Sequence, residues 1–201
     1  MALARPPYYR VDEYLAMERE SVGRHEYLDG QIYEMAGESL QHSRICINLA
    51  VEVGSCLKGR RCEALSPNMK VRTGDSGQFS YPDLTIVCGE PIFLDAYNDV
   101  LLNPAVIFEV LSPSAEAYDR GEKFLRYRNY IDTLTDYVLV SQKRPLIDHF
   151  VRQADGRWLL SSFENLAARI EISAIGCRFE LADIYGRVAF AEAPPPFPGE
   201  S

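Results

Sequence analysis

Two short stretches of the sequence decide the fold: YPDLTIVC, residues 81–88, and AVIFEVLS, residues 105–112. Each is a compact apolar run that is rich in β-branched residues and bounded by turn formers, a pattern typical of a strand buried on both faces of a sheet. Each run also contains one carboxylate, Asp83 in the first and Glu109 in the second. The two stretches therefore predict neighbouring central strands that carry acids.

Glu109 is unexpected in a buried strand, because this charged residue stands between the apolar residues Val-Ile-Phe and Val-Leu. An unpaired buried carboxylate costs several kcal/mol or gives up its charge. If the two strands are antiparallel neighbours, Asp83 lies close to Glu109, with Cβ atoms roughly 4.5 to 5.5 Å apart. Two bare carboxylates at about 4 Å repel by on the order of 4 kcal/mol at an effective dielectric near 20. The pair therefore needs a shared proton, a basic side chain or a cation, and a hard divalent ion such as Mg²⁺ meets that need.

The composition indicates one globular domain. The chain has 201 residues, of which 47% are hydrophobic and 25% charged, enough for a substantial core. We expect a single domain over residues 1–190 and a disordered, proline-rich tail over residues 191–201. The net charge of −8 excludes a protein that binds nucleic acid through a surface that is basic throughout. A polyanion would have to bind at a local basic patch or through a metal. The N-terminal residues lack a signal-peptide pattern and no run is long enough to span a membrane, which predicts a cytoplasmic protein.

Five cysteines are present, and we interpret them as reduced, mostly buried small hydrophobes. They are odd in number and widely spaced, and no CxxC pair suggests zinc.

The N-terminal half predicts a helix, a hairpin and a second helix. VDEYLAMERE, residues 11–20, has the apolar spacing of a short amphipathic helix. An Asp-Gly turn at residues 29–30 predicts a hairpin with Glu26 on its first arm. Ser39 has the position of an N-cap for a helix over residues 40–57, which places His42 in the first helical turn.

The rest of the chain predicts short strands and one basic helix. We expect strands over residues 62–65, 69–73, 135–141 and 177–181, a hairpin over 146–152 and 158–163, and loops over 74–80 and 89–104. Asp119, with Glu122 three residues later, resembles a capping box for a helix that runs to Tyr130. Arg120 and Arg126 help to make that helix locally basic.

Several motifs combine into one pattern: Tyr-Pro-Asp83, Phe-Glu109-Val-Leu-Ser-Pro-Ser, Asp119-x-x-x-Lys123, Tyr137-Val-Leu-Val, His-Glu26-Tyr-Leu-Asp-Gly and the helix-opening His42. The pattern resembles the Uma-two family of PD-(D/E)xK restriction-endonuclease-like proteins, over about residues 8–188. The resemblance implies an α/β (α+β) fold with a restriction-endonuclease-like αβββαβ core, in which a central mixed sheet is flanked by helices. The N-terminal helix and the hairpins would be additions to this core.

The resemblance also implies a Mg²⁺- or Mn²⁺-dependent endonuclease that hydrolyses DNA, with Asp83 and Glu109 as metal ligands. The superfamily's lysine normally lies two residues after the acid, but Leu111 stands there, and the pattern offers Lys123 on the next helix instead. We assign Asp83, Glu109, Lys123 and Glu26 to catalysis. We assign His42, Arg120 and Arg126 to phosphate or substrate binding. A homodimer is expected by analogy, because two copies of one site can cut two strands.

Structural roles compete with these assignments. Glu109 could form an ion pair with Lys123 or an arginine, and Asp119 could serve only as a helix cap. Two other functions therefore stay open: a binding module that keeps the nuclease fold without turnover, and a phosphodiesterase that acts on a small substrate. HExxH, GxxxxGK[ST] and GxSxG motifs are all missing from the sequence, which excludes the enzyme classes that they mark.

Overall fold

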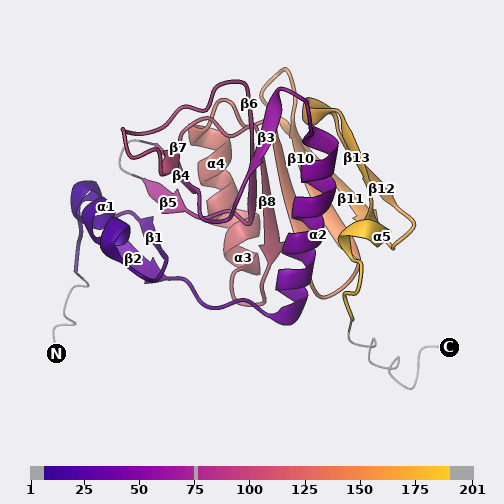
Figure 1. The fold of residues 1–201 in the computed structure, drawn as a ribbon, viewed down its shortest axis with the longest axis horizontal. Coiled ribbons are helices and arrows are strands. Elements are labelled where there is room, and N and C mark those ends of the chain that lie inside the picture. The colour runs from indigo at the N-terminus through magenta and orange to yellow at the C-terminus, as the bar shows by residue number, and fades with distance from the viewer. Residues whose placement is uncertain (1–6, 75–76, 191–201) are drawn as a thin grey trace.

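A six-stranded mixed sheet forms the centre of the computed structural model, which describes residues 7–74 and 77–190 (Figure 1). The strand order is β11-β10-β9-β8-β6-β3, with β6 antiparallel and β9 parallel to β8. This confirms the expected central mixed sheet flanked by helices. The strands are β3 (Cys62–Leu65), β6 (Leu84–Cys88), β8 (Val106–Leu111), β9 (Asp136–Ser141), β10 (Leu146–Arg152) and β11 (Trp158–Glu164).

Strand β8 shows how the sheet separates two cores. Val106, Phe108 and Val110 belong to the core cluster that includes the apolar stripe of α2 (Leu40–Leu57). Ile107 and Leu111 belong to a second cluster with Phe124 and Tyr127 of α4 (Phe124–Tyr130). Successive side chains of a strand point to opposite faces. Glu109 therefore shares the face of Ile107 and Leu111, the side that α4 covers.

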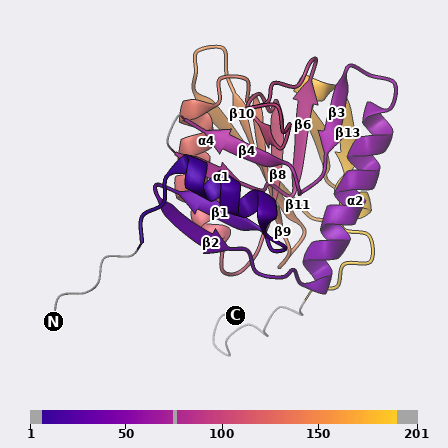
Figure 2. The same cartoon turned by 60° about the vertical axis from the view of Figure 1, so that its left-hand side comes forward.

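The first long helix begins and ends where the sequence predicts. Ser39 is its N-cap, and the Ser39 hydroxyl accepts a hydrogen bond from the backbone N–H of His42 at 3.1 Å. The buried stripe is Ile45, Leu49, Val53 and Leu57, one residue every turn. Figure 2 shows α2 along one side of the molecule, away from α1.

A second sheet lies on the N-terminal side, in the order β2-β1-β5-β4-β7. Its strands are β1 (His25–Leu28), β2 (Gln31–Glu34), β4 (Lys70–Thr73), β5 (Gln78–Ser80) and β7 (Val100–Leu101). The predicted hairpin is β1–β2, and Asp29 and Gly30 in its turn both have positive φ, 46° and 89°. Helix α1 (Val11–Glu20) supplies Tyr14 to a small aromatic core with Tyr27 and Phe79.

The C-terminal elements form the last part of the fold. The predicted hairpin is β10–β11. A small sheet of β12 (Arg169–Ile172) and β13 (Cys177–Glu180), with the turn η2 (Ser173–Ile175) and the short helix α5 (Leu181–Ile184), packs on the α2 side of the central sheet. The predicted tail, residues 191–201, lies outside the described residues.

Three local predictions were wrong. Residues 74–80 do not form only a loop, because Gln78–Ser80 is β5 and is paired on both sides. The long loop before β8 contains the two-residue strand β7. Asp119 is not an N-cap, because helix α3 (Glu116–Tyr118) already begins three residues earlier, where Ser112 Oγ accepts from the Ala115 N–H at 3.1 Å.

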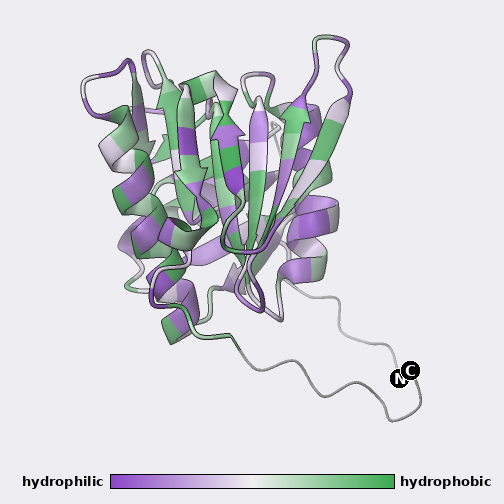
Figure 3. Ribbon diagram, turned by 90° about the vertical axis from the view of Figure 1, so that its right-hand side faces the viewer, coloured by the Kyte–Doolittle hydropathy of each residue, from purple (hydrophilic) through white to green (hydrophobic). Residues whose placement is uncertain are grey.

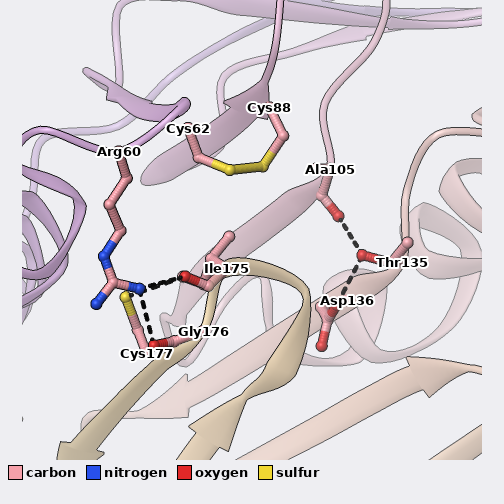
Figure 4. The surroundings of a disulfide bond; sticks show 9 residues. All are labelled: Arg60, Cys62, Cys88, Ala105, Thr135, Asp136, Ile175, Gly176 and Cys177. Atoms are coloured by element: carbon pink, nitrogen blue, oxygen red, sulfur yellow. Dashed lines mark hydrogen bonds between the residues drawn. A yellow bond between two sulfur atoms is a disulfide. The ribbon is translucent and has the colours of Figure 1, made fainter.

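The interpretation of the cysteines as reduced was also wrong. Cys56 pairs with Cys177, and Cys62 pairs with Cys88, so that only Cys46 is free. Cys62 and Cys88 are direct neighbours in the β3–β6 register. Figure 4 shows this disulfide and, near it, Arg60, which donates to the backbone carbonyls of Ile175 and Gly176. Folding brings together residues that are 26 and 121 positions apart, and their spacing in the sequence does not reveal this.

Hydropathy follows the layers of the molecule. Figure 3 shows largely hydrophobic central strands and helices that carry hydrophilic stretches on their outer sides. Within residues 7–74 and 77–190, no helix combines the length and the apolar composition that crossing a membrane requires.

Candidate active site

Asp83 and Glu109 lie side by side because of the β6–β8 register. Leu84 pairs with Phe108, so Asp83, one residue before β6, comes opposite Glu109. Asp83 Oδ2 accepts a hydrogen bond of 2.7 Å from the backbone N–H of Val110. This bond holds the Asp83 carboxylate beside the strand that carries Glu109. The Asp83 side chain is 19% exposed and the Glu109 side chain is 5% exposed. Asp83 therefore lies at the edge of the core and Glu109 lies inside it.

Glu109 is compensated by a cation. Lys123 Nζ lies 2.9 Å from Glu109 Oε1, and the Tyr127 hydroxyl donates to the same oxygen at 3.3 Å. Burial raises the pKa of Glu109 above its ordinary value, and the ammonium group of Lys123 acts against that rise. The ion pair between Glu109 and Lys123, which the sequence offered as the alternative to metal binding by Glu109, is therefore present.

Lys123 is at the centre of the acids. Its Nζ also lies 3.3 Å from Asp119 Oδ1 and 3.6 Å from Glu26 Oε1. Burial by itself lowers the pKa of Lys123, but the carboxylates of Glu109 and Glu26 outweigh it and raise that pKa above its ordinary value. Lys123 thus carries a fixed positive charge in a buried position. We call the residues Glu26, Asp83, Glu109, Asp119 and Lys123 the acidic site.

A π-helical segment supplies two members of the acidic site. Segment η1 (Asp119–Lys123) lies inside one continuous helix, between α3 and α4. Both its first and its last residue are buried, although both are charged. Single π turns within α-helices are frequent at functional sites. Gly121 lies in the middle of the segment, with open space around the position that a Cβ would take.

Glu26 reaches the site from the second sheet. It lies on β1, and its Oε1 accepts from the backbone N–H of Tyr81 at 3.2 Å. The Tyr81 hydroxyl in turn donates to Glu18 of α1 at 2.6 Å. The β1–β5 register places Glu26 opposite Ser80, and Ser80 Oγ lies 2.6 Å from the Tyr127 hydroxyl. The hairpin and the central sheet thus meet at the acidic site.

His42 stands on the other side of Asp83. Its Nε2 lies 3.4 Å from Asp83 Oδ1, and its Nδ1 lies 3.1 Å from Glu38 Oε2. Burial by itself lowers the pKa of His42, but the hydrogen bonds to Asp83 and Cys46 outweigh it and raise that pKa from 6.5 to about 11. The ring is therefore an imidazolium at neutral pH in the metal-free protein, beside the more exposed acid of the pair.

The two arginines that we assigned to the substrate are engaged elsewhere. Arg120 forms ion pairs with Glu116 and Asp148. Arg126 forms ion pairs with Asp29 and Glu122 at the outer side of α4. The structure thus brings Asp83, Glu109, Lys123, Glu26 and His42 together, but not these arginines.

Sequence reasoning missed three contributors to the site. Asp119 was interpreted mainly as a helix cap, Ser80 was placed in a loop, and Tyr127 was not assigned to the site. Gln78 is also buried, on the same face of β5 as Ser80, and neither polar atom of its amide has a hydrogen-bond partner within the described part of the chain. One available signal was the pairing of Asp119 with Lys123 four residues later, on one side of a helix.

Comparisons with known proteins agree with this architecture. An uncharacterized protein of Synechocystis sp. (strain ATCC 27184 / PCC 6803 / Kazusa), slr1290, is 36% identical over 184 residues, which cover 92% of this chain and 95% of that protein. A second uncharacterized protein of that organism, sll1609, is 32% identical over 173 residues, 86% of this chain and 97% of that protein.

A solved structure is also similar. A crystal structure described as a "putative nuclease belonging to DUF820" from Anabaena variabilis ATCC 29413 matches with a TM-score of 0.72 at 18% identity, over 88% of this chain and 97% of that one. At that identity the match shows a common fold. The model of one family, Uma2, described as "Putative restriction endonuclease", matches residues 11–182. The chain therefore belongs to the Uma2 family, as its motifs predicted.

Proposed function

We propose that this protein is a divalent-metal-dependent endonuclease that hydrolyses phosphodiester bonds of DNA at the acidic site. The family and the nuclease-like fold support a nuclease. The observation that carries the finer proposal is the placement of Asp83 next to Glu109, at the point where the core opens to solvent. Two acids on adjoining strand ends repel each other, and a cation that reaches both relieves this repulsion.

The donor set fits a hard divalent ion. Asp83, Glu109 and Glu26 offer carboxylate oxygens, which Mg²⁺ and Mn²⁺ prefer to nitrogen or sulfur. Asp83 is held toward Glu109 by the Val110 N–H, so the ligand is oriented before any ion arrives. Such an ion would lower the pKa of a bound water and polarise the phosphate. We assign Asp83 and Glu109 as its ligands, with Glu26 in contact directly or through a water.

The residues of the chain itself have separate tasks. Lys123 keeps a positive charge at Nζ, where it can stabilise the negative charge that accumulates on the nonbridging phosphate oxygens or orient the attacking water. The His42 imidazolium, beside the exposed edge of Asp83, can bind a phosphate oxygen. Tyr127 holds Glu109 through its hydroxyl.

Plasmid cleavage tests the proposal. The wild-type protein with Mg²⁺ or Mn²⁺ is expected to convert supercoiled plasmid to nicked and linear forms, and Asp83→Asn and Glu109→Gln should each lower the rate at least 100-fold. Glu63→Gln, an exposed acid on the edge strand β3, is the matched control and should cleave like the wild type. Cleavage by Asp83→Asn at the wild-type rate would contradict the assignment.

One observation favours a second candidate, a DNA-binding module without turnover. The ammonium group of Lys123 lies where it satisfies three carboxylates, which makes the site stable without an ion. DNA binding that is retained in Asp83→Asn, with no cleavage by any variant, would support this alternative. Turnover of a generic phosphodiester but not of DNA would indicate a small-substrate enzyme.

The homodimer and the cytoplasmic location stay predictions. The two disulfides bear on the second of these, because disulfides persist mainly in oxidising compartments. Counting free thiols in protein purified with rapid alkylation would decide it: one reactive thiol, that of Cys46, contradicts a reducing location.

A further inference from the structure

Three different metal-binding side chains converge at the start of α2, on the far side of His42 from the acidic site. The side chains are those of Glu38, His42 and Cys46, and one ligand atom from each lies within 4.8 Å of the others. His42 and Cys46 are four residues apart on one face of α2, and Glu38 lies just before the N-cap Ser39. His42 Nδ1 lies 3.1 Å from Glu38 Oε2 and 3.4 Å from Cys46 Sγ.

These separations match the edges of a tetrahedral zinc site. With Zn–O, Zn–N and Zn–S distances of about 2.0 to 2.3 Å, two ligand atoms of a tetrahedral ion lie about 3.3 to 3.8 Å apart. The His42–Cys46 separation of 3.4 Å lies within that range and the His42–Glu38 separation of 3.1 Å lies just below it, so a small outward movement of Glu38 would admit the ion. Glu38 is exposed and free to make that movement.

The second nitrogen of His42 provides independent support. Its Nε2 lies 3.4 Å from Asp83 Oδ1, and Asp83 is itself fixed by the Val110 N–H. A histidine that ligates a metal almost always donates its other ring N–H to a carboxylate or carbonyl, which fixes the ring and its tautomer. The Asp83–His42 contact therefore leaves Nδ1 directed at Glu38 and Cys46, as a ligand would be.

The thiol of Cys46 is available as a third ligand. It is the free cysteine of this structure, since the other four form disulfides, and it is partly exposed rather than sealed in the core. Sulfur and nitrogen donors select zinc and similar ions, whereas the oxygen donors of the acidic site select Mg²⁺ or Mn²⁺. The two neighbouring sites thus differ in the metal that they prefer.

We propose that Glu38, His42 and Cys46 bind one Zn²⁺ or Co²⁺ ion, with Asp83 as the carboxylate that orients His42 and with water at the fourth position. Binding displaces the proton of the Cys46 thiol and the proton at His42 Nδ1, and both protons pass to the solvent. The ion then takes the place of the Nδ1 proton between His42 and Glu38, and the N–H at Nε2 of His42 stays directed at Asp83. This inference does not depend on nuclease activity.

Titration of the whole protein with Co²⁺ tests it, under non-reducing conditions that preserve the disulfides. The first equivalent of Co²⁺ should bind tightly to the wild type and develop a thiolate-to-cobalt charge-transfer band in the near ultraviolet, which one equivalent of Zn²⁺ removes. Cys46→Ala should abolish the band and weaken binding at least 100-fold. Glu38→Gln, a change at an exposed side chain, should weaken it at least 10-fold and keep the band.

Two further variants complete the experiment. Asp83→Asn should weaken Co²⁺ binding about 10- to 100-fold while the band persists, as the loss of an orienting group does. Glu63→Gln should bind like the wild type. The inference is overturned if the wild type gives no charge-transfer band at one equivalent, or if Cys46→Ala gives the same band and affinity. If the wild type binds Co²⁺ as expected but does not cleave plasmid, only the proposed nuclease activity fails.

Discussion

Replacing Lys123 by methionine removes the cation that compensates Glu109. The two groups lie 2.9 Å apart, and the side chains are 6% exposed for Lys123 and 5% for Glu109. At that separation and an effective dielectric near 20, their attraction is about 6 kcal/mol. Removing one partner of a buried ion pair leaves the other without compensation and costs about 3 to 5 kcal/mol. For a chain of this length we expect Tm to fall by roughly 10 °C.

The loss should depend on pH in a defined direction. Burial raises the pKa of Glu109 above 4.5, and Lys123 opposes that rise, so Lys123→Met raises the pKa further. A carboxyl group whose folded pKa is raised contributes stability that is complete below its unfolded pKa and is lost as the pH rises through the folded value. The difference between variant and wild type is therefore smallest near pH 4.5 and grows toward pH 8.

Urea unfolding at several pH values measures this effect. The double variant Lys123→Met/Glu109→Gln should recover part of the lost free energy of unfolding, since Glu109 no longer carries a charge that needs compensation, whereas Asp119 still does. Lys143→Met is the matched control, because Lys143 is exposed and pairs with Glu116 at the surface, where such a pair contributes at most about 1 kcal/mol. A Lys123→Met variant within 1 kcal/mol of the wild type at pH 8 and without a pH trend would refute the reasoning.

Three further predictions follow from individual contacts. Because the pKa of His42 is raised from 6.5 to about 11, its imidazolium should stabilise the metal-free protein fully below pH 6.5 and progressively less up to pH 11; NMR titration of the ring checks this, and a midpoint near 6.5 would contradict it. Replacing both Cys56 and Cys177 by serine should lower the free energy of unfolding by about 2 to 4 kcal/mol, measured in urea, and an unchanged value would show that the disulfide is not formed. Gln78→Met should raise that free energy by about 1 to 3 kcal/mol, because it removes a buried amide whose polar atoms lack partners in the described part of the chain; calorimetry that shows a lower Tm would exclude this.

The elements that were predicted correctly depend on local signals. The N-cap Ser39 and the apolar spacing after it define both ends of α2 to the residue. The positive φ values that Asp-Gly tolerates define the β1–β2 turn. The proximity of Asp83 to Glu109 needed one added assumption, that the two apolar runs pair antiparallel, and the register has that form.

The features that were missed depend on contacts between distant parts of the chain. Strand β5 is three residues long and is defined by its neighbours β1 and β4 rather than by its own composition. The partner of Cys56 is 121 residues away, at a distance in sequence that no spacing rule covers. Asp119 had the sequence of a cap, but the helix begins earlier, at Glu116, so Asp119 lies within the helix and is buried beside Lys123.

The π turn between α3 and α4 makes the acidic site sensitive to a single codon. A π turn holds one residue more than the α-helical path between the same two ends, and each α-helical residue rotates the chain by about 100°. Deletion of Gly121 would remove this extra residue, restore regular α-helical winding between the same two ends, and leave Asp119 and Lys123 three residues apart in place of four. Loss of three nucleotides would thus change the spacing of Asp119 and Lys123 in the site while every strand of the central sheet kept its place.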